Sequence, residues 1–160
     1  MKTQQEVNRA VERYSDMVRR LCLVHLKNRF DTEDIFQTVF LKYMVSDVEF
    51  CSGEHEKAWI IRVTINSCRD FLKSFFRRHT ISLENLLNQP EELSSQSIGV
   101  LEAVLSLPEK YRDVIYLHYV EGYSASEIGQ ILKKNANTVY THLGRGKKLL
   151  KQKLGGDLDE

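Results

Sequence analysis

The sequence predicts an all-α protein of two small helical domains joined by a linker, the C-terminal domain being a helix-turn-helix. Three observations lead to this fold class. Long segments repeat apolar residues at the spacing of one helix face. An acidic segment that contains Pro90 and several Ser and Gln residues separates the two halves. Near the C-terminus, a capped turn precedes a helix that is rich in Lys and Arg.

The first expected helix covers residues 4–27. Its apolar residues recur three or four positions apart and therefore share one face: Val7, Val11, Tyr14, Val18 and Leu21. The arginines of this segment lie off that face, and we expect them to be solvated.

Asp31–Met44 is expected to form the second helix, with Thr32 as its N-cap and acidic residues in its first turn. The core face of this helix consists of Ile35, Phe36, Val39, Phe40 and Tyr43. A mainly polar stripe remains on another face and consists of Asp34, Gln37, Thr38 and Leu41. Single exposed apolar residues are common, so the stripe by itself indicates no function.

Residues Val45–Glu56 lack a helical period and contain Gly53, so we interpret them as a loop. Cys51 and His55 are four positions apart, but without a second pair of ligands we attribute this spacing to chance. The chain has three cysteines and no C-x-x-C motif, which argues against a disulfide framework or a zinc knuckle. We therefore expect no metal site and no cofactor.

The third long helix is expected over Glu56–His79. The residues assigned to its inward face are Trp59, Val63, Cys68, Phe71, Leu72 and Phe75. Aromatic residues interleaved with cations are typical of surfaces that bind single-stranded nucleic acid. An ordinary core helix whose cations extend to solvent also explains the pattern, and on this segment alone it is slightly favoured.

Thr80–Ser97 is acidic, contains Pro90 and ends in Ser and Gln residues, which is typical of an interdomain linker. A short helix is expected over Ile98–Leu107, and Pro108 suits the first turn of the next helix. The expected organisation is three helices in residues 1–79, a linker at 80–97, and four helices in residues 98–160.

The helix-turn-helix lies within Tyr111–Leu154. Its first helix ends at Gly122 and is marked by Val114, Ile115, Leu117 and Tyr119. Ser124 and Glu127 form a capping box that opens the second helix, whose apolar residues are Ile128, Ile131 and Leu132. Two capped amphipathic helices also occur in ordinary bundles, so the spacing alone leaves both interpretations open.

The last helix decides between them. Asn135 is placed to cap it, and Val139, Leu143, Leu150 and Leu154 share one face. Residues 133–154 contain seven Lys/Arg and no Asp/Glu. We interpret this segment as a recognition helix, whose N-terminus enters the major groove of DNA.

The net charge of +1 hides a strong segregation along the chain. Residues 57–79 have a net charge of +5, residues 80–109 of −5, and residues 133–154 of +7. This pattern suggests two surfaces for a polyanion, one in each half of the chain. There is no apolar run of membrane-spanning length and no signal peptide, so we expect a cytoplasmic protein without membrane insertion.

Three segments in order resemble a bacterial RNA polymerase sigma factor of the extracytoplasmic-function (ECF) group. They are DTEDIFQTVFLKYM, KAWIIRVTINSCRDFLKSFFRR and LEAVLSLPEKYRDVIYLHYVEGYSASEIGQILKKNANTVYTHLGRGKKLL. That group contains only sigma regions 2 and 4, joined by a linker, and the resemblance covers nearly the whole chain. The partners that it implies are core RNA polymerase, through its β′ clamp coiled coil and β flap, and promoter DNA, both duplex and melted. An anti-sigma factor is a further candidate partner.

The resemblance also implies roles for individual residues. The helix Asp31–Met44 would dock on the β′ clamp coiled coil through Asp34, Ile35, Gln37, Thr38 and Leu41. The loop Ser46–Glu56 and the helix Lys57–Arg78 would capture the melted minus-ten strand, with contacts from Trp59, Arg62, Asn66, Arg69, Asp70, Lys73 and Arg77. The recognition helix would read the minus-thirty-five duplex through Asn135, Asn137, Thr138, Tyr140, Thr141, His142, Arg145, Lys147 and Lys148.

The chain departs from the family pattern at several positions. Thr38 replaces a usual acid, and Lys133 and Lys134 replace the Gly and apolar residue that are common in the tight turn. Basic and Ser residues that are common in the recognition helix are replaced by Tyr140, Thr141 and His142. Gly144 and Gly146 are each expected to cost this helix about 1 kcal/mol relative to Ala. These departures concern docking details and the promoter sequence, not the fold.

The expected function is that of a sigma factor that binds core RNA polymerase and directs promoter-specific initiation, with no catalysis of its own. No Ser/His/Asp or Cys/His grouping and no phosphate-binding Gly loop is present. The alternative is a stand-alone helix-turn-helix transcriptional regulator, which needs a ligand or dimerisation module in residues 1–96 for which the sequence shows no signature. A helical adaptor whose basic helices are merely solvated is disfavoured by the charge segregation.

Overall fold

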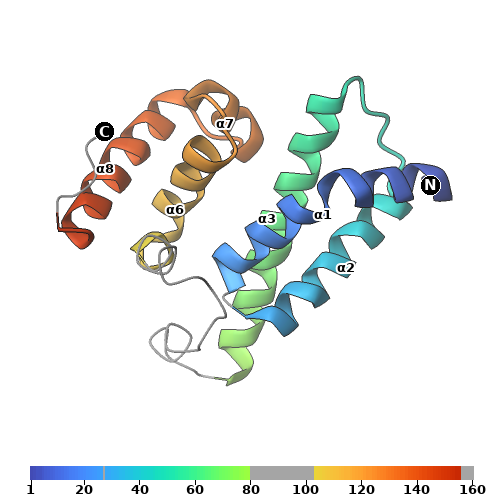
Figure 1. The fold of residues 1–160 in the computed structure, drawn as a ribbon, viewed down its shortest axis with the longest axis horizontal. Helices are drawn as coiled ribbons and strands as arrows, with labels where there is room; N and C mark the ends of the chain where they lie inside the picture. Colours follow the sequence, from blue (N-terminus) through green and yellow to red (C-terminus); the bar gives the residue numbers. More distant parts are fainter. Residues whose placement is uncertain (27, 80–102, 156–160) are drawn as a thin grey trace. The chain divides into compact units, whose positions relative to one another are not determined.

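The computed structural model of the chain describes residues 1–26, 28–79 and 103–155. Within these ranges every regular element is a helix, and the chain divides into two compact units, Met1–Glu91 and Glu92–Glu160 (Figure 1). The prediction of an all-α fold with two helical domains is therefore confirmed. The expected linker at 80–97 and the first half of the expected helix at 98–107 lie outside the described residues, and residues 103–105 of that helix are helical.

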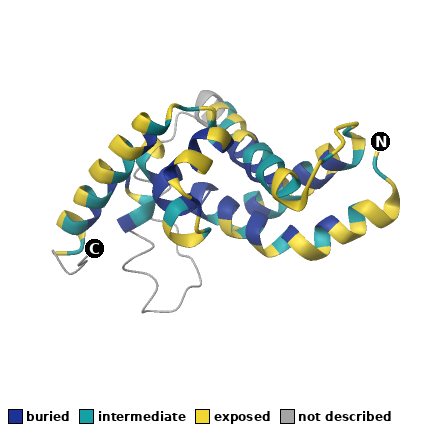
Figure 2. Cartoon of the chain, turned by 90° about the horizontal axis from the view of Figure 1, so that it is seen from above, coloured by how far each residue is buried: buried dark blue, intermediate teal, exposed yellow. Residues whose placement is uncertain are grey.

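Unit 1 contains three long helices: α1 (Gln4–Leu26), α2 (Arg29–Val45) and α3 (Gly53–His79), each packed against the other two (Figure 1). Figure 2 shows that their buried faces meet in the interior, while exposed residues cover the outer sides. The side chains that are completely buried there include Val18, Leu21, Cys22, Val39, Ile60 and Ile61. The Arg19 guanidinium also joins α1 to α2, since it donates to both carboxylate oxygens of Glu33, at 3.0 and 3.2 Å.

The N-cap of α2 differs from the prediction. Asn28, not Thr32, caps this helix, because its side chain accepts a hydrogen bond of 2.8 Å from the backbone N–H of Asp31. The hydroxyl of Thr32 is buried and donates instead to the carbonyl of Asn28, at 2.7 Å. The helix consequently begins at Arg29, two residues before the predicted start.

The loop between α2 and α3 is shorter than predicted. The helix α2 continues to Val45, and α3 begins at Gly53, so only Ser46–Ser52 connect them. The early start of α3 follows from Ser52, whose hydroxyl accepts a 3.1 Å hydrogen bond from the backbone N–H of His55.

The inward face of α3 was only partly predicted. Cys68 is buried as expected, but Trp59, Val63, Phe71 and Leu72 are half-buried, and the side chain of Phe75 lies outside the described residues. The positions that fill the core are Ile60, Ile61, Thr64 and Ile65. This helix has apolar residues on more than one side, so its sequence alone does not identify the side that faces α1 and α2.

Unit 2 contains α6 (Glu109–Ile115), which continues as the π-helical turn η1 (Tyr116–Val120), then α7 (Ala125–Leu132) and α8 (Ala136–Lys153). The helix α8 packs against both α6 and α7. The core side chains of this unit include Leu107, Val114, Ile115, Leu117, Ile128, Val139 and Leu150. Tyr119, one of the four residues that mark the first helix in the sequence, lies in the π-helical turn and is 51% exposed.

The turns of unit 2 agree with the predicted helix-turn-helix. Gly122 has a φ of +79°, and Ser124 forms the complete capping box with Glu127. Asn135 caps α8 by accepting a 2.8 Å hydrogen bond from the backbone N–H of Asn137. Between α7 and α8, Lys133 occupies the left-handed region at φ 56°, a conformation that Gly adopts without strain.

Candidate polymerase and nucleic-acid interfaces

The predicted docking stripe lies on the outer side of α2. Asp34, Gln37 and Leu41 are exposed, and Leu41 has 56% of its surface accessible. Thr38 is half-buried, and its hydroxyl donates to the backbone carbonyl of Asp34 at 3.0 Å. Ile35 is 8% exposed, which places its side chain in the core beneath the stripe.

The stripe is longer than the prediction. Val45, four positions after Leu41, is 60% exposed, so the two side chains form an apolar pair on one face of α2. The same spacing connects Leu41 to Gln37. The sequence contains this signal, but the predicted helix ends at Met44 and the predicted loop begins at Val45.

The residues predicted to capture single-stranded DNA share one face of α3. They are spaced three, four, three, one, three and four positions apart, which keeps all of them within one stripe of a helix. Asn66, Asp70 and Lys73 are exposed, whereas Trp59, Arg62 and Arg69 are half-buried. Arg77 belongs to the same helix, but its side chain lies outside the described residues.

Trp59 belongs to an aromatic cluster that joins α3 to the loop before it. The ring of Phe50 lies 5.7 Å from that of Trp59, 6.1 Å from Tyr43 and 5.1 Å from His55, measured between centroids. The rings of Phe50 and Tyr43 are parallel, whereas those of Trp59 and His55 meet Phe50 edge to face, and both arrangements stabilise the packing of aromatic rings. Phe50 was not among the predicted site residues, because its contacts with α2 and α3 depend on the fold.

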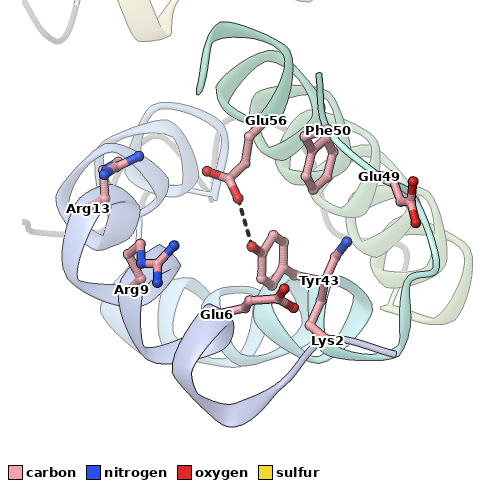
Figure 3. A pocket seen from close by; sticks show the side chains of 8 residues that line it. All are labelled: Lys2, Glu6, Arg9, Arg13, Tyr43, Glu49, Phe50 and Glu56. Carbon is pink, nitrogen blue, oxygen red and sulfur yellow. Dashed lines mark hydrogen bonds between the residues drawn. The ribbon is translucent and has the colours of Figure 1, made fainter. Parts of the chain in front are cut away.

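A cavity of about 420 Å³ opens beside this cluster, between α1 and the loop (Figure 3). Glu56 lies at its inner wall and accepts hydrogen bonds from the hydroxyls of Tyr43, at 2.7 Å, and Tyr14, at 3.0 Å. Burial raises the pKa of both tyrosines, and the adjacent carboxylate adds to the effect. The cavity is lined by three cations, three carboxylates and two aromatic rings: Lys2, Arg9, Arg13, Glu6, Glu49, Glu56, Tyr43 and Phe50.

Most of the predicted recognition residues lie on the exposed side of α8. Exposed side chains are those of Asn137, Thr138, Tyr140, Thr141, Arg145 and Lys148, and that of Lys147 is half-buried. Tyr140 has 64% of its surface accessible, so a large aromatic side chain projects from the first half of the helix. In the described part of the chain, residues 133–153 contain only cationic charges, and these flank the exposed side of α8.

Two of the predicted recognition residues are placed differently. The side-chain oxygen of Asn135 accepts a hydrogen bond from the backbone N–H of Asn137, so this residue caps the helix. The ring of His142 faces α6, at 5.5 Å from the ring of Tyr111, and its buried Nδ1 has no hydrogen-bond partner among the described residues. Burial lowers the pKa of His142, and the nearby cations Lys134, Lys110 and Arg145 lower it further.

Exposed cationic side chains are thus present on one face of α3 and on one face of α8, besides the mainly polar stripe on α2. Within the described residues, no helix combines the length and the apolar character that a bilayer crossing requires.

Comparisons with known proteins agree with this arrangement. The family model "Sigma-70 region 2" matches residues 10–78, and "Sigma-70, region 4" matches residues 97–150. Together they cover most of the helical residues of both units.

Similar proteins are found among curated sigma factors. The chain is 29% identical to "ECF RNA polymerase sigma factor SigW" of Bacillus subtilis, over 90% of this chain and 86% of that protein. It is 31% identical to "ECF RNA polymerase sigma factor SigE" of Mycolicibacterium smegmatis, over 90% of this chain and 60% of that protein.

Solved structures share the fold. Sigma factor RpoE of Bartonella quintana, determined in complex with the anti-sigma factor NepR, matches with a TM-score of 0.80 and 17% identity, over 96% of this chain and 99% of that chain. CnrH, determined with the cytosolic domain of CnrY, matches with a TM-score of 0.69 and 21% identity, over 98% and 92% of the two chains. The chain therefore belongs to the sigma-70 family, in its extracytoplasmic-function group, and is a sigma factor that binds core RNA polymerase and directs promoter-specific initiation of transcription.

Proposed function

We propose that the work of this sigma factor is divided among three helix faces. The observation that supports this division most strongly is that α2, α3 and α8 each present an exposed stripe whose residues contribute little to the core. The domains would be residues 1–79 for sigma region 2 and 98–160 for region 4, with 80–97 as the linker.

The stripe on α2 would dock on the β′ clamp coiled coil of the polymerase. Asp34 and Gln37 would provide polar contacts, and Leu41 with Val45 would provide an apolar patch. Exposed apolar side chains grouped on one helix face are typical of protein interfaces. Ile35 would act indirectly, because its buried side chain holds α2 against the core.

The face of α3 would capture the melted minus-ten strand. Arg62, Arg69 and Lys73 would neutralise phosphates, and Trp59 with Phe50 would offer aromatic surfaces to unstacked bases. Each captured base must offset an unstacking cost of a few kcal/mol. Stacking on an aromatic ring contributes about 1–3 kcal/mol per base, which is enough for this purpose.

The exposed side of α8 would read the minus-thirty-five duplex, and the region 4 unit as a whole would also meet the β flap. Asn137, Tyr140 and Thr141 in the first half of the helix would face base edges, whereas Arg145 and Lys148 would contact phosphates. His142 would support the helix from its inner side.

The protein would perform no catalysis of its own, since polymerase supplies the chemistry, and it would act in the cytoplasm where that enzyme works. An anti-sigma factor is a further proposed partner, because the structural relative RpoE was determined in complex with the anti-sigma factor NepR. The alternative of a stand-alone regulator would require DNA binding without polymerase docking.

The docking proposal is tested by reversing one charge. Asp34→Arg should weaken co-purification with core RNA polymerase and leave the fold intact, since the Asp34 side chain is exposed. Glu12→Arg, a reversal at an exposed position of α1, is the matched control and should co-purify at the wild-type yield. Wild-type yield for Asp34→Arg would rule out this docking face.

A further inference from the structure

The loop Ser46–Ser52 connects the polymerase-facing helix to the strand-capturing helix, and it is fixed by contacts from outside itself. On its inner side, Phe50 packs against Tyr43 of α2 and Trp59 of α3. Tyr43 in turn donates to Glu56, in the first turn of α3, at 2.7 Å. These contacts fix where the loop begins and ends.

The outer side of the loop is held by Lys2, which precedes α1. The backbone N–H of Lys2 donates to the carbonyl of Met44, at the end of α2, at 2.8 Å. Its ammonium group donates to the carbonyl of Val48 in the loop. The same ammonium lies 4.8 Å from the centroid of the Phe50 ring and 5.8 Å from that of Tyr43.

The charges around Lys2 suit this placement. Figure 3 shows Lys2 beside Tyr43 and Glu6, with its ammonium group directed toward Phe50 and Glu49. An ammonium over the faces of aromatic rings is attracted by their negative charge density, and the attraction is larger where water is partly excluded. Lys2 is half-buried, so part of its stem also covers apolar surface.

We propose that Lys2 is a positioning residue for strand capture: it holds the loop Ser46–Ser52 in the conformation that receives the melted strand. The inference rests on the proposed function of α3 and this loop. Lys2 acts through Phe50 and Val48, and it need not touch DNA itself. It lies more than forty positions from the loop in sequence, which is why the motif pattern did not include it.

The free protein offers a direct measure of loop position, because Trp59 is the one tryptophan in the sequence and packs against Phe50. Lys2→Ala should release the loop and increase the acrylamide quenching of Trp59 fluorescence. Lys2→Arg keeps the charge and a donor, so it should stay close to the wild type. Arg29→Ala, which removes an exposed cation at the far end of α2, is the charge-matched control.

The functional arm uses the complex with core polymerase and a minus-ten non-template oligonucleotide containing 2-aminopurine. Lys2→Ala should bind this strand about tenfold more weakly, the scale of losing one hydrogen bond from a charged group. Lys2→Arg should recover most of the affinity, and Arg29→Ala should match the wild type. Core binding should be equal for all four proteins, which shows that each is folded.

The possible failures are distinguishable. If the wild-type complex does not bind the strand, the proposed function of α3 is wrong. If the wild type binds and Lys2→Ala binds equally well, the positioning role of Lys2 is wrong. If Lys2→Ala weakens strand binding while Trp59 quenching is unchanged, Lys2 contacts the DNA directly, and the positioning role is again overturned.

Discussion

Gly144 and Gly146, two positions apart in α8, have opposite surroundings. A Cβ atom at Gly144 would meet no other atom within 4 Å. A Cβ atom at Gly146 would lie 2.9 Å from Cγ1 of Ile115 and 3.2 Å from Cβ of Tyr111. Gly146 therefore lets α8 approach α6 closely. The sequence predicted the same cost for both glycines, because the helix that packs against Gly146 is distant in the chain.

Alanine at these two positions should change stability in opposite directions. Gly144→Ala should raise the free energy of unfolding by up to about 1 kcal/mol, since Ala has the higher helix propensity. Gly146→Ala should lower it by about 1–3 kcal/mol, because the added methyl group overpacks the contact with Ile115. Urea unfolding followed by circular dichroism measures both changes. Equal shifts in the same direction would show that the α6–α8 contact is looser than described.

His142 should make the stability of unit 2 depend on pH. Its pKa in the folded protein lies below the usual 6.5, chiefly through burial, so the unfolded state binds a proton more readily. The contribution of His142 to the free energy of unfolding has its full value above pH 6.5 and declines as the pH falls toward the lowered pKa.

The comparison of wild type with His142→Gln isolates this contribution, since other titrating groups are common to both proteins. The urea midpoint of the wild type should fall more between pH 7.5 and pH 5.5 than that of the variant. Identical decreases would mean that the imidazole is as accessible to protons when folded as when unfolded.

At the scale of the element, helical spacing and capping residues predicted where most helices lie but not always which side they bury. In α7 and α8, the capping box of Ser124 and the cap at Asn135 were predicted correctly, because each involves only neighbouring residues. In α3, the buried side depends on where α1 and α2 lie. Ile60 and Ile61 are buried in the core, whereas Trp59, which was predicted to face inward, is half-buried. Likewise, the exposure of Tyr119 depends on a π-helical turn that no local pattern indicates.

Mutations in the first half and in the second half of α8 should affect DNA binding differently. Tyr140→Ala should change which minus-thirty-five sequence is preferred, because this exposed ring lies in the part of α8 that is proposed to face base edges. Lys148→Ala should weaken binding to all sequences alike and reduce the slope of log affinity against log salt by about one. A randomised minus-thirty-five library measures the first effect, and a salt titration the second. An unchanged ranking with Tyr140→Ala would exclude base reading by this residue.

At the scale of the whole molecule, the sequence predicted two helical domains, and the helix contacts described above each lie within one of the two units. The individual site residues of α2, α3 and α8 were implied by the family resemblance, whereas the residues alone indicated only the mainly polar stripe of α2 and the cationic character of α3 and α8. Features that join distant segments could not be predicted from the sequence. Examples are the hydrogen bonds that Glu56 accepts from Tyr14 and Tyr43, and the contact of Lys2 with the loop Ser46–Ser52. The segregation of positive charge into two segments is a property of the whole chain and was visible from the sequence.

The central claim is that this chain selects the promoters at which polymerase starts. Mapping transcript 5′ ends from genomic fragments, with core RNA polymerase alone and with the purified chain added, tests it most directly. Discrete start sites should appear only with the chain, share one pair of upstream elements, and disappear with Asp34→Arg. Identical 5′ ends with and without the chain would contradict the claim, and selective DNA binding without any change in those ends would favour a stand-alone regulator.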